Sequence, residues 1–380
     1  MFRCSVVKIL APWFLLFVFS ACGTTTGDND YAGGGIGGTG VSVGKITEAG
    51  STSVDVNGVA FDTTNASVTV DGVAGNQNNL KVGMIVKVDG TFNQDGTTGV
   101  ATNIEFKDIL EGPVELVDPA SNTIVVLGQT VIVDSATYFD DFFDLDSNGA
   151  VDVTEFMNDI VVGNIVEVSG FVDTDGIIHA SYISLKYEIF EDDGSEIELK
   201  GIIANLDADA MTFTIGIQTI DYGNATFEDM TIDTLNNGLY VEVKSYAGVI
   251  GNMLIASKIE LEDDGYHFED NDEFKVEGYV TALLAEGKFE LAGQTVQVIA
   301  TTQYKDGSIV DIADIKVNMK LEVEGTVDAL GVLVADRIKV ESGDNGLEDD
   351  SDDDSDDDST DSPDGADDES DDDEGCNDPS

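Results

Sequence analysis

Residues 144–155, DLDSNGAVDVTE, carry side chains whose types and spacing could hold a metal ion. The side chains that offer an oxygen are Asp144, Asp146, Asn148, Asp152 and Glu155. Gly149 stands in the middle of the stretch, where a sharp turn favours a residue without a side chain. Because Ca²⁺ is a hard cation that takes six to eight oxygen ligands, oxygens at every second position could wrap around one ion.

The stretch resembles the calcium-binding loop of EF-hand proteins. That loop supplies ligands from positions 1, 3, 5, 7, 9 and 12 and has glycine at position 6. The resemblance implies a calcium ligand set of Asp144, Asp146, Asn148, the main-chain carbonyl of Ala150, Asp152 and Glu155. Val151 adds the apolar residue of position 8. An acidic surface loop without an ion is the alternative in so acidic a chain.

The flanks of the loop match the resemblance only in part. Residues 155–160, EFMNDI, predict the start of an exit helix, whereas residues 138–143, YFDDFF, are too few for a full entering helix. No second loop pairs with this one, so we expect weak binding, with a dissociation constant of about 10⁻⁴–10⁻³ M. Calcium would then act as a structural cofactor that stabilises its domain.

Other patterns that could carry chemistry are weak. The two histidines, His179 and His267, neighbour neither a cysteine nor an activated serine, and no H-E-x-x-H, G-x-S-x-G or C-x-x-C occurs. A G-x-G-x-x-G match begins at Gly33, but no strand precedes it and no apolar helix follows it, so it reads as a linker. We therefore expect a protein that is not an enzyme.

The elements that must position the loop come from an internal repeat. Four segments align without gaps, and each is followed by the pattern A-x-x-I; they are 80–90, 160–170, 235–245 and 315–325. A period of about eighty residues indicates an array of small domains. The loop stands in the second unit, where the other units have a shorter connection, so we interpret it as an insertion.

Each unit reads as β-structure. Alternation of the V-x-V type places one side chain inward and the next outward. Asn57-Gly58 suits a tight hairpin turn in which both residues take positive φ. One column of the repeat holds Gly83, Gly163 and Gly238, with Asn318 in the fourth unit, which predicts a left-handed backbone there. We expect an all-β array of four small antiparallel barrels of OB-like type, each with five or six strands.

Residues 33–342 resemble a bacterial envelope family known as domain of unknown function 5666. The resemblance rests on GGIGGTGVSVGKITEAGSTSVDVNGVAFDT at the start and on the recurring VGxxVxVxG and A-x-x-I patterns. These motifs consist of structural glycines and strand residues. The resemblance therefore implies a fold and an envelope location, and it carries no catalytic residues.

The first residues predict export. Arg3 and Lys8 precede and flank an apolar run, ILAPWFLLFVF, that is too short to span a bilayer stably. The sequence FSAC ends at Cys22 and resembles the lipobox of bacterial lipoproteins, which implies cleavage before Cys22 and lipidation of that residue. Gly23 in the next position would allow transfer to the outer membrane, facing either the periplasm or the surface. A plain signal peptide with a chance cysteine is the alternative.

Composition limits the partners. The chain of 380 residues has 76 acidic and 17 basic residues and a formal net charge of −59, which repels nucleic acid. After cleavage and lipidation only Cys376 remains as a free thiol, so we expect no disulfide within the chain. The predicted segments are a lipoprotein signal peptide (1–21), a glycine-rich tether (22–41), four repeats (42–109, 110–188, 196–262 and 274–342) and a disordered Asp/Ser-rich tail (343–380).

Two functions remain compatible with these features. The first is a non-enzymatic, lipid-anchored envelope protein that presents tandem barrels to a protein or polysaccharide partner, with one calcium site in the second repeat. The alternative is an accessory lipoprotein that binds or processes carbohydrate, because barrels of this type often bind sugars across one face. Exposed aromatic residues would form the sugar platform, and the candidates are Tyr182, Tyr187 and Phe190.

Overall fold

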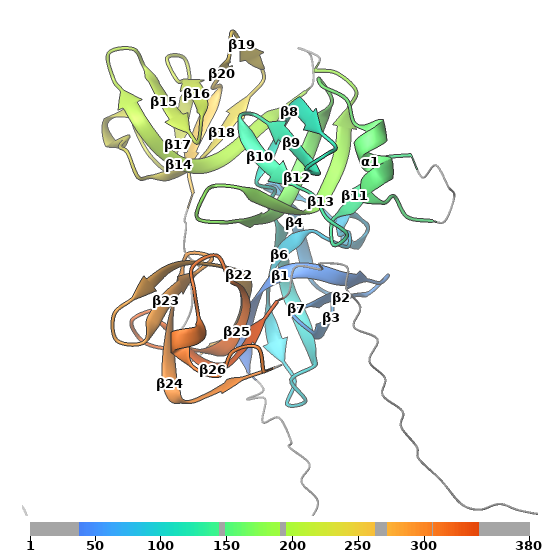
Figure 1. The fold of residues 1–380 in the computed structure, drawn as a ribbon, viewed down its shortest axis with the longest axis vertical. Helices are drawn as coiled ribbons and strands as arrows, with labels where there is room; N and C mark the ends of the chain where they lie inside the picture. The colour runs from blue at the N-terminus through green and yellow to red at the C-terminus, as the bar shows by residue number, and fades with distance from the viewer. Residues whose placement is uncertain (1–37, 144–148, 191–194, 263–271, 306, 342–380) are drawn as a thin grey trace, which may run out of the picture. The chain divides into compact units, whose positions relative to one another are not determined.

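The computed structural model describes residues 38–143, 149–190, 195–262, 272–305 and 307–341. These residues form four small β-barrels in tandem, as expected, with one short α-helix and three 3₁₀-helices (Figure 1). The predicted signal peptide, most of the tether, the tail and His267 lie outside the described residues. Within them, no helix combines the length and the apolar character needed to cross a bilayer.

Repeats 1 and 2 are built from similar elements. Repeat 1 contains β1 (Thr39–Ala49), β2 (Ser53–Val56), β3 (Val59–Asp62), β4 (Ser67–Val70), β5 (Val73–Ala74), η1 (Gln77–Asn79), β6 (Ile85–Phe92) and β7 (Thr98–Phe106). Repeat 2 contains β8 (Leu110–Asp118), β9 (Thr123–Val126), β10 (Gln129–Ile132), β11 (Tyr138–Asp140), α1 (Val153–Asp159), β12 (Ile165–Val172) and β13 (Ile178–Tyr187). The first strand therefore begins inside the predicted tether, because Val41 is buried in a core.

Repeats 3 and 4 follow the same plan. Repeat 3 contains β14 (Ile197–Asp207), β15 (Thr212–Ile215), β16 (Gln218–Asp221), β17 (Thr226–Glu228), η2 (Ile232–Thr234), β18 (Tyr240–Ser245), β19 (Val249–Ile250), β20 (Met253–Ile255) and β21 (Lys258–Leu261). Repeat 4 contains β22 (Glu273–Leu284), β23 (Lys288–Leu291), β24 (Gln294–Tyr304), η3 (Ile312–Asp314), β25 (Lys320–Val327) and β26 (Leu333–Val340).

The strand pairing closes each repeat into a barrel. In repeat 1, β1 pairs with β2, β2 with β3, β3 with β7, β7 with β6, and β6 again with β1. Of these five pairs, only β3–β7 is parallel. Repeat 4 closes in the same order through β22, β23, β24, β26 and β25. This five-stranded Greek-key closure is that of an OB-like barrel.

The glycine column and the hairpin turn behave as predicted. Gly83, Gly163 and Gly238 have φ values of 93°, 101° and 92°, and Asn318 has a φ of 67°. Asparagine is the side chain that best tolerates this left-handed region, which explains why it replaces glycine in repeat 4. At the first hairpin, Asn57 and Gly58 have φ values of 52° and 67°, as a tight two-residue turn requires.

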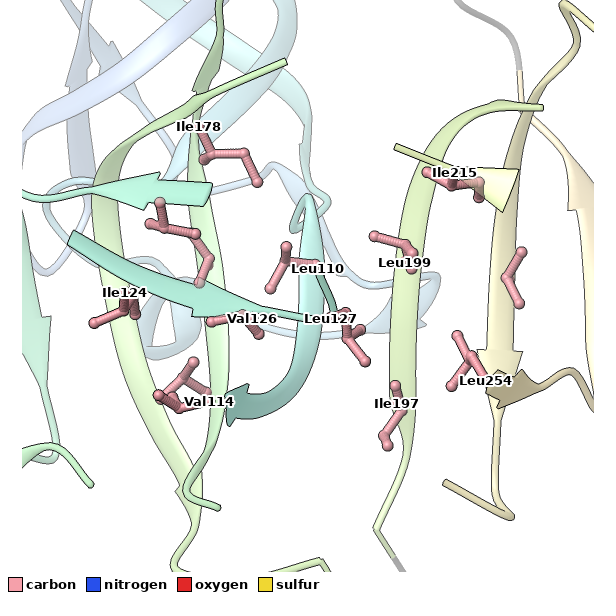
Figure 2. Close-up of a cluster of buried hydrophobic side chains, with 14 of the residues drawn as sticks. Leu110, Val114, Ile124, Val126, Leu127, Ile178, Ile197, Leu199, Ile215 and Leu254 are labelled. Carbon is pink, nitrogen blue, oxygen red and sulfur yellow. The ribbon is translucent and has the colours of Figure 1, made fainter. Parts of the chain in front are cut away.

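Repeats also join one another through strands. β1 of repeat 1 pairs in parallel with β22 of repeat 4, and β8 of repeat 2 pairs antiparallel with β14 of repeat 3. The largest apolar core runs through repeats 2 and 3 and includes Leu110 and Leu199, which are register partners in the β8–β14 pair (Figure 2). Strand pairing therefore joins repeat 1 with repeat 4 and repeat 2 with repeat 3, while repeats 1 and 2 also contact each other, since Tyr182 of β13 lies in the apolar core of repeat 1.

Candidate functional site

The C-terminal end of the predicted calcium loop is the start of helix α1. Asp152 has an extended backbone, with φ −91° and ψ 172°, and is the N-cap residue of the helix. Its carboxylate accepts a hydrogen bond from the Glu155 N–H at 2.8 Å, and the Glu155 carboxylate accepts one from the Asp152 N–H at 3.2 Å. This reciprocal capping box satisfies two main-chain donors and fixes where the helix begins.

The structure places the predicted ligands only in part. Asp144, Asp146 and Asn148 lie outside the described residues. Ala150 and Asp152 are exposed, whereas Glu155 is 8% exposed and lies against Asp152. Gly149 has a φ of 98°, and a Cβ atom there would meet nothing within 4 Å. The glycine is therefore required by its backbone conformation, as position 6 of a calcium loop demands.

The two flanks of the loop are held together by apolar packing. The fully buried Phe156 ring lies 4.3 Å from the Phe139 ring and 4.9 Å from the Phe142 ring, measured between centroids. The Asp159 carboxylate accepts a hydrogen bond from the Phe143 N–H at 3.3 Å. Residues 138–140 form strand β11, so the segment before the loop contributes a strand where an EF-hand has a helix.

The other repeats have a capped turn at the same place in the barrel. The capping pairs are Asn76 with Asn79, Thr231 with Thr234, and Asp311 with Asp314. Capping alone therefore accounts for carboxylates at Asp152 and Glu155. What sets repeat 2 apart is length: residues 141–151 separate β11 from its cap. In repeat 1, residues 71–75 lie between β4 and the cap and include β5, and in repeats 3 and 4 the segments before the caps are 229–230 and 305–310. The loop is an insertion, as the sequence predicted.

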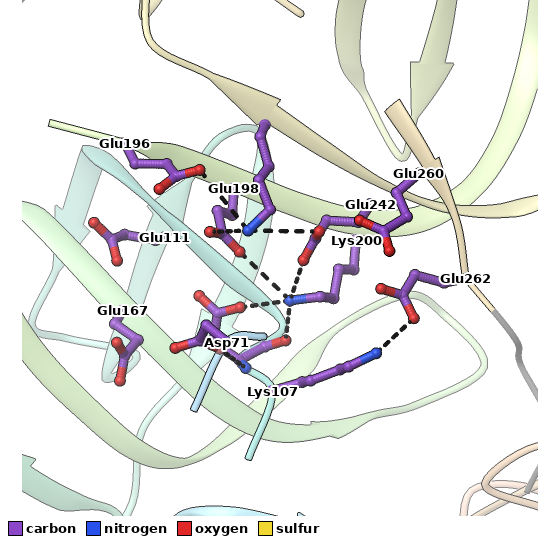
Figure 3. Close-up of polar contacts among 12 residues, drawn as sticks. Asp71, Lys107, Glu111, Glu167, Glu196, Glu198, Lys200, Glu242, Glu260 and Glu262 are labelled. Atoms are coloured by element: carbon purple, nitrogen blue, oxygen red, sulfur yellow. Dashed lines mark hydrogen bonds and ion pairs between the residues drawn. The ribbon is translucent and has the colours of Figure 1, made fainter. Parts of the chain in front are cut away.

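A second group of functional interest is a buried charge network that our sequence reasoning missed (Figure 3). Its centre is Lys200 of β14, whose side chain is 4% exposed. The Lys200 ammonium lies 2.7 Å from the carboxylate of Asp108, in the link between repeats 1 and 2, and 2.9 Å from that of Glu242 on β18. It also donates a hydrogen bond to the Asp108 carbonyl at 3.0 Å. One lysine thus ties repeat 3 to the repeat 1–repeat 2 link.

Two further lysines extend this network. Lys244 donates to Glu198 at 2.5 Å, and Lys186 lies 2.5 Å from Glu167 and 3.2 Å from Glu111. Burial raises the pKa of Glu111 to about 7 and that of Glu198 to about 8, and nearby carboxylates add to both shifts. Burial would lower the pKa of Lys200, but Asp108 and Glu242 more than offset it, so that pKa is raised. The network holds more carboxylates than ammonium groups.

The network does not form an evident metal site. Glu242, Glu260 and Glu262 present carboxylate oxygens within 4.8 Å of one another. Each of them already pairs with an ammonium group: Glu242 with Lys200, Glu260 with Lys258, and Glu262 with Lys107. A cavity of about 400 Å³ lies beside them, and its lysines are paired as well, through Glu262, Asp108 and Asp89. The three glutamates and these cavity lysines thus already have oppositely charged partners among the described residues.

The prediction of a platform of three exposed aromatic side chains is wrong for Tyr182, which is buried. Tyr182 is 2% exposed, belongs to the core of repeat 1 and donates a hydrogen bond to Asp140 at 3.2 Å. Phe190 is half-buried against the core of repeats 2 and 3, and only Tyr187 is clearly exposed, at 40%. The buried Tyr182 ring and the half-buried Phe190 ring pack at contacts between repeats, which the sequence of a single strand does not reveal. His179 is half-exposed and contacts Asp173 at 3.1 Å.

Sequence comparison gives this arrangement a family. A domain of unknown function (DUF5666) matches residues 43–105, 111–184, 200–260 and 277–339, which together cover more than half of the chain. The four matched segments coincide with the four barrels. No curated protein matches the chain. The chain therefore belongs to the DUF5666 family and carries four copies of its domain.

Proposed function

We propose that this chain is a non-enzymatic, lipid-anchored protein of the cell envelope that displays four β-barrels for binding or scaffolding, with calcium stabilising repeat 2. The observation that carries the calcium proposal is the insertion 141–151 between β11 and the cap of α1. The segments before the capped turns of the other repeats are shorter. The sequence of the insertion meets the ligand pattern of a calcium loop, and Asp152 caps the helix at position 9 of that pattern.

The described geometry fits such a loop at three points. Gly149 has the positive φ that position 6 needs, the helix starts immediately after Asp152, and Glu155 is directed toward Asp152 in the first turn. When bound, calcium would supply a positive centre for carboxylates that otherwise repel one another. Ala150 would offer its carbonyl, and Asp152 and Glu155 their carboxylates, from the part of the loop nearest the helix.

Isothermal titration of the chain with calcium tests this proposal. We expect one site with a dissociation constant of about 10⁻⁴–10⁻³ M. Its heat should be distinguishable from that of weak, nonspecific calcium binding by the other acidic residues. The variant Glu155→Gln keeps a residue that can complete the capping box, so it should lose the site without losing the helix. Unchanged binding in this variant and in Asp144→Ala would overturn the calcium proposal.

A matched control comes from repeat 4. Asp311 and Asp314 form the same kind of capping box, but repeat 4 lacks the inserted ligand pattern. Asp314→Asn should therefore leave calcium binding unchanged. A similar loss in Asp314→Asn and Glu155→Gln would mean that the heat comes from general acidity.

The anchor proposal rests on the sequence FSAC and on Cys22. Lipidation of Cys22 would place the barrels beyond a glycine-rich tether at the membrane surface, and Gly23 permits sorting to the outer membrane. The test is fractionation of cells that express the chain or the variant Cys22→Ser. We expect the parent chain in the outer-membrane fraction and the variant in the soluble envelope fraction; membrane association of both would reject the anchor.

The carbohydrate alternative gains no support, since Tyr182 and Phe190 are packed at contacts between repeats. The proposed partner of the displayed barrels is a protein or a polysaccharide of the envelope. A scaffold is favoured because the strands that join repeats 1 with 4 and 2 with 3 make paired barrels from one chain.

A further inference from the structure

Among the residues that the structure describes, two carboxylates at the joints between repeats have a buried oxygen without a hydrogen-bond partner. They are Glu198 on β14, at the β8–β14 joint, and Glu273 on β22, at the β1–β22 joint. Both residues are at most 6% exposed. A buried ionised carboxylate needs donors or cations on both oxygens, and without them it takes up a proton instead.

Glu198 faces other acids across the joint. Its register partner on β8 is Glu111, and Glu242 on β18 pairs with the same two ammonium groups, Lys200 at 2.9 Å and Lys244 at 3.5 Å. One of its oxygens accepts from Lys244 at 2.5 Å, but the other lies 3.7 Å from the Lys200 ammonium. Where several buried carboxylates share few ammonium groups, the least compensated of them favours its protonated form.

Apart from Lys244, which pairs with Glu198 itself, the cations around Glu198 pair with other acids. Lys200 forms ion pairs with Asp108 and Glu242, and Lys186 forms ion pairs with Glu111 and Glu167. The remaining charged neighbour is Glu196, 3.8 Å from Lys244. Ammonium groups are therefore too few to neutralise every carboxylate at this joint.

Glu273 is in a similar position at the other joint. Its register partner on β1 is Gly40, which brings no charge. The nearby cations are Lys275 on β22 and Arg337 on β26, and both pair with Glu324 on β25, at 3.2 Å and 2.6 Å. Asp336 on β26 adds a further negative charge. The cations near Glu273 therefore pair with another carboxylate, that of Glu324.

We propose that Glu198 and Glu273 are protonated when the β8–β14 and β1–β22 joints are formed. Both joints should therefore weaken as the pH rises. Burial raises the pKa of Glu198 to about 8 and that of Glu273 to about 7, and neighbouring acids increase both shifts. Because the folded pKa exceeds the unfolded one, the stabilisation is complete below about pH 4.5 and is lost as the pH passes 7 to 8.

The first test counts protons. Calorimetric unfolding at pH 6.5 in two buffers of different ionisation enthalpy gives the protons released on unfolding. Glu198→Gln carries a neutral side chain of the same shape, so it should release about one proton fewer than the parent chain. Glu273→Gln should show a similar loss. Equal release by the parent and both variants would overturn the proposal.

The control is Glu242→Gln in the same network. Burial raises the pKa of Glu242, but Lys200 and its other partners outweigh this effect, and the net shift is downward. Glu242 is therefore ionised in the folded chain, and its replacement should lower the melting temperature across pH 6–9 without removing the released proton. Glu198→Gln should instead raise the melting temperature at pH 9 and leave it unchanged near pH 4.5.

A second measurement locates the effect at the joint. The main-chain N–H of Lys200 donates a hydrogen bond to the Ile109 carbonyl at 3.1 Å, which links repeat 3 to the segment before β8. Hydrogen exchange at this amide, corrected for intrinsic rates, should accelerate by at least tenfold between pH 6 and pH 9 in the parent chain and by much less in Glu198→Gln. A pH-independent protection factor in the parent chain would refute a joint that opens with pH.

Discussion

The Lys200 ammonium lies 2.7 Å from the Asp108 carboxylate, and both side chains are almost fully buried. Asp108 belongs to the link between repeats 1 and 2, while Lys200 belongs to the first strand of repeat 3. The Asp108 N–H in turn donates to Asp71 of repeat 1 at 3.1 Å. The ion pair and the hydrogen bond thus connect repeats 1 and 3 through the link that leads to repeat 2, in a place where solvent cannot screen the charges.

Lys200→Met tests how much this connection contributes. The substitution keeps most of the side-chain volume but leaves Asp108 and Glu242 buried without their main cation. We expect the free energy of unfolding to fall by about 3–5 kcal/mol, measured by chemical denaturation. The comparison is Lys339→Met, whose pair with Glu341 is half-exposed and should matter by less than about 1 kcal/mol. Similar losses in the two variants would contradict this account.

The glycine column predicts two different costs for the same substitution. At Gly163 a Cβ atom would meet nothing within 4 Å, so Gly163→Ala should cost only the left-handed backbone penalty of about 1–2 kcal/mol. At Gly83 the Cβ atom would lie 2.3 Å from the Ser181 carbonyl oxygen of repeat 2. Gly83→Ala should therefore lower the free energy of unfolding further and separate repeats 1 and 2. Equal losses of unfolding free energy in the two variants would show that the contact between Gly83 and Ser181 accommodates the added methyl group.

Calcium should raise the stability of repeat 2 if the inserted loop binds it. At a free calcium concentration one hundred times the dissociation constant, the expected gain is about 2.7 kcal/mol. The measurement is the melting temperature of the chain with calcium and with a chelator. The gain should disappear in Glu155→Gln and persist in Asp314→Asn; persistence in both would assign the effect to other acidic residues.

Glu322 provides a pH-dependent prediction inside one barrel. Burial, with Glu341 as the next cause, raises its pKa to about 7, and its register partner on β22 is Glu277. The folded chain therefore holds a proton that the unfolded chain releases, and stability falls as the pH rises from about 4.5 through 7. Glu322→Gln should raise the melting temperature at pH 8–9 and have no effect near pH 4.

Glu324 on the same strand is the contrasting position. It pairs with Lys275 and Arg337, so Glu324→Gln should lower the melting temperature at pH 8. A stabilising effect there, or a destabilising effect of Glu322→Gln at pH 8, would show that the balance of charges in repeat 4 differs from the one described.

Much of the fold could be predicted because its determinants are local. The repeat period, the V-x-V alternation and the turn at Asn57-Gly58 act within a single barrel, and Asn318 revealed the left-handed column by replacing glycine. The inserted loop was also visible, since its ligand spacing is a property of consecutive residues. The start of helix α1, where the loop ends, follows from the capping pair Asp152 and Glu155, which are three residues apart.

The charge network escaped prediction for a physical reason. In the strand Ile197-Glu198-Leu199-Lys200, alternation sends Glu198 and Lys200 to the face opposite the core, which in an isolated barrel is exposed to water. Their burial depends on another barrel covering that face. Tyr182 was misjudged in the same way, because its ring is buried by repeat 1 rather than by its own barrel.

The sequence by itself determined the four barrels, the location of the insertion and the residue types that could bind calcium, since each depends on neighbours along the chain. Only the tertiary structure decided which barrels pair and which charges they bury between them. Strand pairs such as β1–β22 join residues more than two hundred positions apart, and their energy depends on surfaces brought together by the whole chain. The burial of Glu198, Lys200 and Glu273, and hence their response to pH, follows from that assembly.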